Sequence, residues 1–539
     1  MAYAEPETEM LAGNQLSDWN SVQWKKVERN VAKLRKQIYR ATQESKFRRL
    51  RKLQRLVLKS PAVKVLAIKR VTQINDGRKT AGIDGKVIDN HKDRVKIANE
   101  KIDFNSYKPL PVKRIYIPKS DGFKRPLGIP IIKDRIIEAI AKEALEPEWE
   151  AKFEANSFGF RPGRCTQDAI NEIYAALNNS AVGRNQWILD ADIKKAFDTI
   201  SQEFILNQIE DFPAKGLISK WLKAGYVEIG EIHETITGTP QGGVISPLLA
   251  NIALDGLQAH LGKGYRYVRY ADDFVIMAKT KQAIEEIKPK VEQWLSERGL
   301  KLNDEKTRII HRDEGFNFLG FHIRMYKNGK LIIKPQQEKV KNLLDRIKVW
   351  LDSHKQAKAE AIPEQFNPIL RGWANYYRFV CSKRTFSYVE NRTRWMLWKW
   401  AKRRHPNKPV PWILNKYFEK TGNGKTYVFK GLFRIDHVPI VRYVKVKGKA
   451  SPDDPTLKEY WENRKKKISK IYYAKGSKLY RIAENQNWKC DLCGNWLING
   501  EKIDRHHIDP NRKDRDAISN LVIRHESCHY QGHSNSRRT

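Results

Sequence analysis

The sequence predicts a multidomain α+β fold, in which one large mixed core is flanked by helical segments and followed by a small Cys- and His-rich unit. Its 539 residues correspond to about three to four domains of roughly 150 residues each. Strand-like and helix-like segments alternate between residues 61 and 325, separated by Gly and Pro turns. The last 59 residues hold three of the five Cys and five of the thirteen His, which indicates a separate unit.

The charge balance indicates a polyanionic partner. Lys and Arg number 102 against 62 Asp and Glu, giving a formal net charge of +40, and nucleic acid is the commonest partner of so basic a chain. The sequence has no apolar run of roughly 18 residues, so we expect no membrane partner. Glu5, Glu7 and Glu9 argue against a secretory signal, and five Cys form no disulfide framework. These features predict a reducing, cytoplasmic compartment.

Residues 1–60 are expected to form a basic helical extension. Trp24, Val27, Val31 and Leu34 recur at spacings of three and four, which predicts a buried stripe on a helix. Lys and Arg residues lie between them, and we expect that face to follow phosphates.

Two short segments carry acids inside β-prone stretches. Asp190 and Asp192 share an apolar, strand-like segment, whereas Asp272 and Asp273 are expected at the apex of a hairpin. Burying paired carboxylates is costly unless cations neutralise them, and Mg²⁺ prefers carboxylate oxygens. Three acids on neighbouring strands could hold two ions about 4 Å apart for in-line phosphoryl transfer. Side chains alternate along a strand, so Asp190 and Asp192 share a face and both are candidate ligands.

The segment Tyr270-Ala271-Asp272-Asp273 resembles the signature of reverse transcriptases. Six further blocks occur in the order found in the enzymes that group II introns encode, across residues 75–325. These blocks are TAGIDG (80–85), IPKSDG with RPLGIP (117–130), FGFRPGR (158–164), GTPQGGVISP (238–247), GLKLN (299–303) and NFLGF (317–321). One such string is weak evidence, but seven in order are specific.

This resemblance implies a right-hand polymerase fold with appended domains. The basic extension would precede the fingers and palm at residues 61–325, followed by a helical thumb or maturase (X) domain at 326–410. A small DNA-binding region would occupy residues 411–480. A ββα-metal HNH domain would occupy residues 481–539.

The resemblance also implies which residues form the polymerase site. Mg²⁺ would be held by Asp192, Asp272 and Asp273 with the backbone of Ile193. The dNTP substrate would contact Lys119 and Arg125 through its triphosphate, Phe197 beneath its deoxyribose, and Gln241. A primer 3′-OH would attack the α-phosphate, and pyrophosphate would leave.

Two ligand pairs with two-residue gaps lie near the end of the chain. Cys490 and Cys493 form one pair, and His525 and Cys528 form the other. Four donors of these types suit a tetrahedral structural Zn²⁺ site. His525 stands where many family members have Cys, and Zn²⁺ accepts either donor.

A second cluster, between and after these pairs, resembles the HNH nucleases. His529 and His533 are four residues apart, which places both on one face of a helix. The resemblance implies that His506, His529 and His533 hold one Mg²⁺ or Mn²⁺ ion. His507 would be the general base that activates water, and Asn520 would brace the loop that orients it.

The region after the predicted palm is aromatic and basic. Pro363 and Pro368 are expected to interrupt its helical pattern, and residues 371–378 interleave Arg with Trp and Tyr. The aromatic residues either pack in the core or stack on bases, while the cations meet phosphates. Residues 411–480 are expected to form short strands and turns, followed by a basic run at 464–467.

Taken together, the resemblance implies a multifunctional group II intron-encoded protein of a prokaryotic cytoplasm. It would bind its intron RNA and assist splicing, nick target DNA, and copy the RNA from the new 3′-OH in target-primed retrohoming. One alternative is a splicing-only maturase with idle enzymatic sites, and another is a different prokaryotic reverse transcriptase, such as a retron or diversity-generating enzyme. The sequence leaves open whether the chain forms a homodimer.

Overall fold

A computed structural model describes residues 15–118, 122, 124–178, 185–421, 426–473 and 476–536, with side chains through residue 531. The strands in this part of the chain form five separate sheets. No helix within it is long and apolar enough to cross a bilayer.

The N-terminal helices pack directly on the mixed core. They are α1 (Trp24–Gln43), α2 (Phe47–Lys59), α3 (Pro61–Lys69) and α4 (His91–Asn99). The predicted stripe on α1 is confirmed, because Trp24, Val27, Val31 and Leu34 are all buried. The first three helices contact α5 (Ile132–Lys152) and share one hydrophobic cluster with the palm. The N-terminal helices therefore pack as part of the same hydrophobic core.

The sheet that carries the predicted acids, called the palm sheet after the predicted domain, is four-stranded and antiparallel, in the order β6-β7-β3-β8. Its strands are β3 (Trp187–Asp192), β6 (Arg266–Tyr270), β7 (Asp273–Ala278) and β8 (Arg308–His311). Helix α12 (Lys281–Ser296) contacts β3, β7 and β8, whereas α6 (Thr166–Leu177) contacts β6. Leu189 and Ile276 belong to one hydrophobic cluster, while Ile188 and Val275 belong to another. Alternate residues thus face separate cores, as in a sheet covered on both sides.

A second four-stranded sheet, called the fingers sheet below, has the strand order β2-β1-β4-β5 and lies within the region predicted to form fingers and palm. Its strands are β1 (Val112–Pro118), β2 (Lys124–Ile129), β4 (Tyr226–Glu228) and β5 (Glu231–His233). Helices α7 (Ala196–Thr199), α8 (Gln202–Gln208), α9 (Lys215–Lys223), α10 (Ser246–Ala253) and α11 (Leu257–Leu261) complete the core.

A three-stranded sheet and four helices follow the palm. They are β9 (Phe316–Phe318), β10 (Phe321–Met325), β11 (Leu331–Pro335), α13 (Gln337–Ser353), α14 (Ala361–Tyr377), α15 (Lys383–Arg404) and α16 (Val410–Tyr417). The expected interruption at Pro363 and Pro368 is wrong, because α14 runs through both. Pro363 lies in the first turn, where its missing N–H costs nothing. Around Pro368 the buried Phe366 and Leu370 anchor the helix in the hydrophobic cluster.

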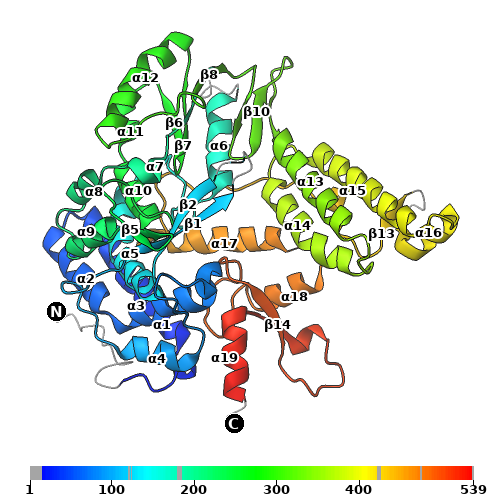
Figure 1. Ribbon diagram of the computed structural model, residues 1–539, viewed down its shortest axis with the longest axis horizontal. Helices are drawn as coiled ribbons and strands as arrows, with labels where there is room; N and C mark the ends of the chain where they lie inside the picture. Colours follow the sequence, from blue (N-terminus) through cyan, green and yellow to red (C-terminus); the bar gives the residue numbers. More distant parts are fainter. Residues whose placement is uncertain are drawn as a thin grey trace.

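Residues 411–480 agree with the expected short strands and turns at one hairpin and the segment that follows it, but helices stand at both ends of this region. After the hairpin of β12 (Phe418–Lys420) and β13 (Tyr427–Phe429) come α17 (Lys458–Tyr472), α18 (Lys478–Asn485), β14 (Ile503–His507), β15 (Leu521–His525) and α19 (Glu526–Ser536). The basic run at 464–467 lies inside α17, where Trp461 and Arg464 are buried. Figure 1 shows α17 crossing the middle of the molecule, with α13–α16 to one side and α19 below.

Candidate functional site

The four acids predicted from sequence come together at one end of the palm sheet. Asp272 and Asp273 lie where β6 turns into β7, so the expected hairpin is confirmed. In the β3–β7 register Asp192 is directly opposite Asp273, and Asp190 is opposite Val275. Asp190 and Asp192 therefore share a face of β3, and the register alone does not separate their roles.

The tight hairpin turn is held by a hydrogen bond from Arg269 and packs against Gly159 of the FGFRPGR block. Ala271 has a left-handed φ of 59°, which is unfavourable for a residue with a Cβ. The buried Arg269 side chain donates from Nη1 to the Ala271 carbonyl at 3.2 Å and to Asn251 Oδ1 at 2.9 Å. Asn251 Nδ2 in turn donates to the Gly159 carbonyl at 2.8 Å. Gly159 lies so close to the turn that an added Cβ would be 2.4 Å from the Ala271 nitrogen.

The electrostatics of this cluster favour a bound cation. Burial, reinforced by the charges of Asp272, Asp192 and Asp190, raises the pKa of Asp273 to about 7. Burial, with Asp192 nearby, also raises the pKa of Asp190 to about 7. Burial and the Asp192 charge raise the pKa of Asp272 as well. The one lysine that forms an ion pair here among the described residues, Lys306, lies 3.2 Å from Asp192 Oδ2. Carboxylates that repel one another in this way are a suitable donor set for Mg²⁺.

Three neighbours of these acids were not predicted. Asn303 donates from its backbone nitrogen to the Asp192 carbonyl at 2.8 Å and from Nδ2 to Asp192 Oδ2 at 3.2 Å. It closes the GLKLN block, so its position in that motif was a usable signal. Lys306 and Arg308 follow without any distinctive spacing, and Arg308 lies opposite Asp190 in the β3–β8 register. Ile193, the predicted backbone ligand, is buried and bridges to Leu302.

Phe197 and Gln241 line one pocket of about 220 Å³ between the fingers sheet and α7. The Phe197 ring contacts Phe160 edge-on, with centroids 6.3 Å apart. Gln241 Nε2 donates to Asp198 Oδ1 at 3.4 Å. The Gln241 carbonyl accepts from the Gly128 nitrogen of β2 at 2.6 Å, which fixes the turn against the fingers.

The segment after Gln241 is also held by a buried carboxylate, Glu138, which was not predicted from the sequence. Glu138 Oε2, on α5, accepts a hydrogen bond from the Val244 backbone nitrogen. Gly243 lies against this carboxylate, where an added Cβ would be 3.3 Å from Glu138 Oε2. Burial raises the pKa of Glu138 to about 8, although the Val244 N–H opposes that rise. No motif marks Glu138, because its role depends on contact between distant segments.

The two predicted triphosphate ligands are placed unequally. Arg125 is exposed on β2, and its positive charge lowers the pKa of Asp272 against the effect of burial. Arg125 is therefore within electrostatic reach of the acids. Lys119 lies outside the described residues.

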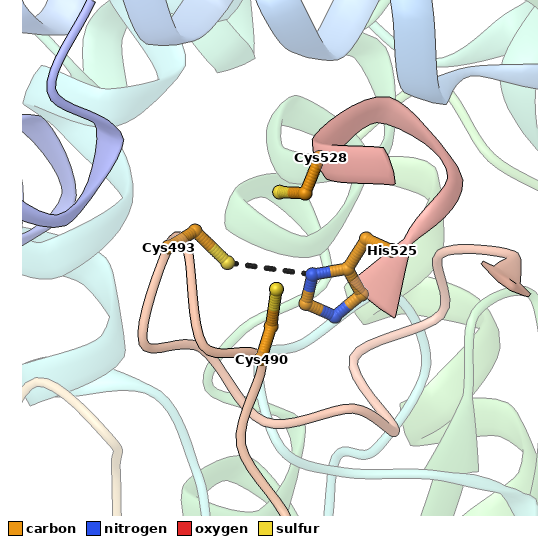
Figure 2. A group of neighbouring side chains, drawn as sticks. All are labelled: Cys490, Cys493, His525 and Cys528. Atoms are coloured by element: carbon orange, nitrogen blue, oxygen red, sulfur yellow. Dashed lines mark hydrogen bonds between the residues drawn. The ribbon is translucent and has the colours of Figure 1, made fainter. Parts of the chain in front are cut away.

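The two predicted ligand pairs of the C-terminal unit form one compact cluster. The donor atoms of Cys490, Cys493, His525 and Cys528 all lie within 4.8 Å of one another, and all four residues are buried. Figure 2 shows them converging, with Cys493 Sγ 3.3 Å from His525 Nδ1. A tetrahedral Zn²⁺ with Zn–S bonds of about 2.3 Å places its donors about 3.8 Å apart, so this set fits the ion. His525 Nε2 lies 3.2 Å from the Trp496 carbonyl, which would leave Nδ1 for the metal.

Next to this cluster, β14, β15 and α19 form a ββα unit. The His506 and His529 rings approach each other from β14 and α19, with centroids 5.1 Å apart. His529 Nδ1 also lies 3.5 Å from Asp504 Oδ2, a carboxylate that the sequence did not single out. The side chain of His533 lies outside the described part of the chain, although its backbone continues α19.

The loop between the two strands is closed by Asn520. Its buried side chain accepts from the Asp509 nitrogen at 2.9 Å and donates to the Asp509 and Arg515 carbonyls at 2.8 and 2.9 Å. His507 lies on the adjoining strand, with Nε2 3.4 Å from Asp516 Oδ1. That contact pulls the pKa of Asp516 down.

The aromatic and basic stretch at 371–378 is largely structural. Tyr376 and Tyr377 donate from their hydroxyls to the Leu319 and Gly320 carbonyls at 2.9 and 3.1 Å, which joins α14 to the turn between β9 and β10. Arg378 is buried and donates to the Ile471 carbonyl at 3.1 Å, so it is not available to phosphates. The packing alternative therefore holds for these three residues.

Three protein-family models match segments of this chain. Residues 117–323 match the family described as reverse transcriptase (RNA-dependent DNA polymerase), residues 19–100 the N-terminal domain of reverse transcriptase, and residues 340–418 the group II intron maturase-specific domain. Protein YkfC of Escherichia coli K12 is 33% identical over 321 residues, covering 51% of this chain and 84% of that protein. Group II intron-encoded protein LtrA of Lactococcus lactis is 27% identical over 414 residues, covering 58% and 68%. Telomerase from Candida albicans in complex with a telomeric RNA fragment aligns with a TM-score of 0.34 at 14% identity, covering 59% of this chain and 62% of that chain.

Proposed function

Because the chain belongs to the group II intron family of reverse transcriptases with a maturase domain, we propose that it copies intron RNA into DNA from a 3′-OH that its own C-terminal domain makes. The observation that carries the polymerase assignment is the register of Asp192 against Asp273, with Asp272 beside them. The pocket that holds Phe197 and Gln241 supports the same assignment.

Each residue of the polymerase site has a defined task in this proposal. Asp192, Asp272 and Asp273 would hold Mg²⁺, which stabilises the attacking 3′-oxygen and the leaving pyrophosphate when bound. Phe197 would pack beneath the sugar and exclude a 2′-OH, and Gln241 would orient the nucleotide. Lys119 and Arg125 would neutralise the triphosphate, and the fork of Arg125 suits two phosphate oxygens.

Primer extension on an RNA template with dNTPs and Mg²⁺ tests this assignment. We expect cDNA from the wild-type protein and none from Asp272→Ala, while RNA affinity stays within a few-fold. Asp304→Ala, an exposed aspartate on the turn after Asn303, is the matched control and should extend normally. No cDNA from folded, RNA-binding wild-type protein would favour the splicing-only maturase.

A DNA-nicking activity is supported by the ββα unit, in which His506 and His529 approach each other beside a loop closed by Asn520. We propose that His506, His529 and His533 hold Mg²⁺ or Mn²⁺, and that His507 takes the proton from the attacking water. The nicked target DNA would then present the 3′-OH that the polymerase extends, as target-primed retrohoming requires. Zn²⁺ at the Cys₃His cluster would hold the unit together.

Conversion of supercoiled DNA to the open-circular form, with Mg²⁺ or Mn²⁺, tests the nuclease. We expect His507→Ala to abolish conversion and to leave extension of a supplied primer unchanged. His354→Ala, an exposed thumb histidine, is the control. Nicking that persists in His507→Ala would place the general base elsewhere.

A further inference from the structure

One buried lysine of the N-terminal helices points at the Cys₃His cluster. Lys69, the last residue of α3, is 2% exposed, and its Nζ lies 3.9 Å from Cys528 Sγ. The same ammonium lies 4.5 Å from the centroid of the Trp24 ring. Among the described residues, no ion pair joins Lys69 to a carboxylate, whereas the nearby Arg70 and Arg78 each have one. Burying an ammonium without an anion costs free energy, so a negative charge near this position would stabilise it.

The zinc centre would supply that charge. Three thiolates and a neutral imidazole around Zn²⁺ carry a net charge of −1, which one ammonium offsets. We infer that Lys69 is the outer-shell cation of this centre, and that metal binding thereby fastens the C-terminal domain to the N-terminal helices. The inference rests on the zinc site proposed above and extends it to contacts between domains.

Other contacts show that these two parts of the chain form one interface. Gln531 Nε2 on α19 donates to the Asn20 and Val22 carbonyls at 2.8 and 3.2 Å. Arg78 Nη2 lies 3.8 Å from Glu526 Oε2 at the start of α19. The apolar residues of both parts also belong to a single hydrophobic cluster, whose members include Trp19, Trp24, Ile68, Trp488, Leu497 and Cys528.

In this arrangement the metal lies at the interface between the proposed nuclease domain and the polymerase core. In a freely tethered domain the ligands would be shielded by the domain's own residues. Here Cys528 is fully buried, and the residue of α3 that contacts its sulfur carries a charge. Removing the metal should therefore disturb α1 and α3, which contribute no ligand.

The first test measures the metal itself in the full-length protein. We expect one Zn²⁺ per chain by elemental analysis, and a zinc affinity in Lys69→Met about 10-fold or more weaker, from competition with a chromogenic chelator. Lys69→Arg, which keeps the charge, should recover most of that affinity. Lys59→Met, an exposed lysine at the end of α2, should bind zinc like the wild type.

Hydrogen exchange gives a second, mutation-free readout. Removing zinc from the wild-type protein with a chelator should speed amide exchange in residues 19–27 and 63–69 as well as in the C-terminal domain. Zinc bound with unchanged affinity in a folded Lys69→Met, or exchange altered only beyond residue 488, would overturn the inference and leave the zinc site standing. A wild-type protein that binds no zinc would overturn both.

Discussion

Asp192 and Asp273 are direct partners in the antiparallel register of β3 and β7, one at the end of its strand and the other at the start. Two like charges opposite each other in a sheet destabilise it unless a cation lies between them. Lys306 forms an ion pair with one member of this pair, Asp192. The negative charge at this end of the palm sheet is therefore not fully neutralised, and binding of a divalent ion would reduce the repulsion between the two carboxylates.

This relationship predicts that Mg²⁺ affinity rises with pH. The pKa of Asp273 is raised to about 7 in the metal-free protein, so a proton must leave when the ion binds. A raised carboxyl pKa also means that the metal-free fold loses stability as pH rises from about 4 through 7. Calorimetric titration at pH 6, 7 and 8 should show affinity increasing most below 7. Asp273→Asn should bind weakly and lose this dependence, and a pH-independent wild-type affinity would contradict the assignment.

Gly159→Ala tests whether the FGFRPGR block positions the Asp272–Asp273 turn. The new Cβ would lie 2.4 Å from the Ala271 nitrogen, and backbone on both sides cannot yield easily. We expect primer extension to fall by about 10-fold or more, with a stability loss of about 1–3 kcal/mol. Gly216→Ala on α9 meets nothing within 4 Å and is the control. Full activity in a folded Gly159→Ala would show that the turn adapts.

Much of the site was predictable because the chemistry lies in contiguous strings. Short local patterns identify the hairpin with Asp272 and Asp273, the strand with Asp192, and the two Cys/His pairs. The structure brings the acids together in one group and the Cys/His pairs in another. The predicted interruption of α14 at Pro363 and Pro368 was wrong because burial of neighbouring apolar residues outweighs the local effect of proline on a helix.

The supporting residues could not be predicted, because their roles arise only from tertiary contact. Glu138 is an ordinary helical glutamate until α5 brings it to Val244, and Lys69 is an ordinary lysine until Cys528 reaches it from the other end of the chain. Arg464 belongs to a basic run whose sequence does not set it apart from its neighbours, yet its side chain is buried.

Glu138 is expected to act as a positioning residue for the nucleotide pocket. Glu138→Ala would leave the Val244 N–H without its acceptor, at a cost of about 1–3 kcal/mol, and would release the turn that carries Gln241. We expect the KM for dNTP in steady-state primer extension to rise several-fold, with a smaller change in kcat. Glu138→Gln keeps an acceptor and should restore KM, whereas the exposed Glu210→Ala should change nothing. Equal KM values in all variants of normal stability would exclude this role.

In the basic run on α17, Arg464 should be structural, whereas Lys466 and Lys467 are exposed cations. Arg464 Nη2 lies 3.2 Å from Asp168 Oδ1 and donates to the Tyr443 hydroxyl at 2.9 Å, and both charged side chains are buried. Arg464→Ala strands the Asp168 charge and should lower the free energy of unfolding by about 3 kcal/mol or more. Lys466 and Lys467 are exposed on the same helix, so their double Ala variant should keep its stability.

We expect the opposite result for DNA affinity, which the Lys466 and Lys467 double Ala variant should lose and Arg464→Ala should keep. If Lys466 and Lys467 each meet a phosphate, their removal reduces the slope of log affinity against log salt by about 2. Thermal unfolding and binding titrations across a salt series measure both quantities on the same proteins. An Arg464→Ala protein that stays fully stable but loses DNA affinity would mean that α17 turns Arg464 outward when it meets DNA.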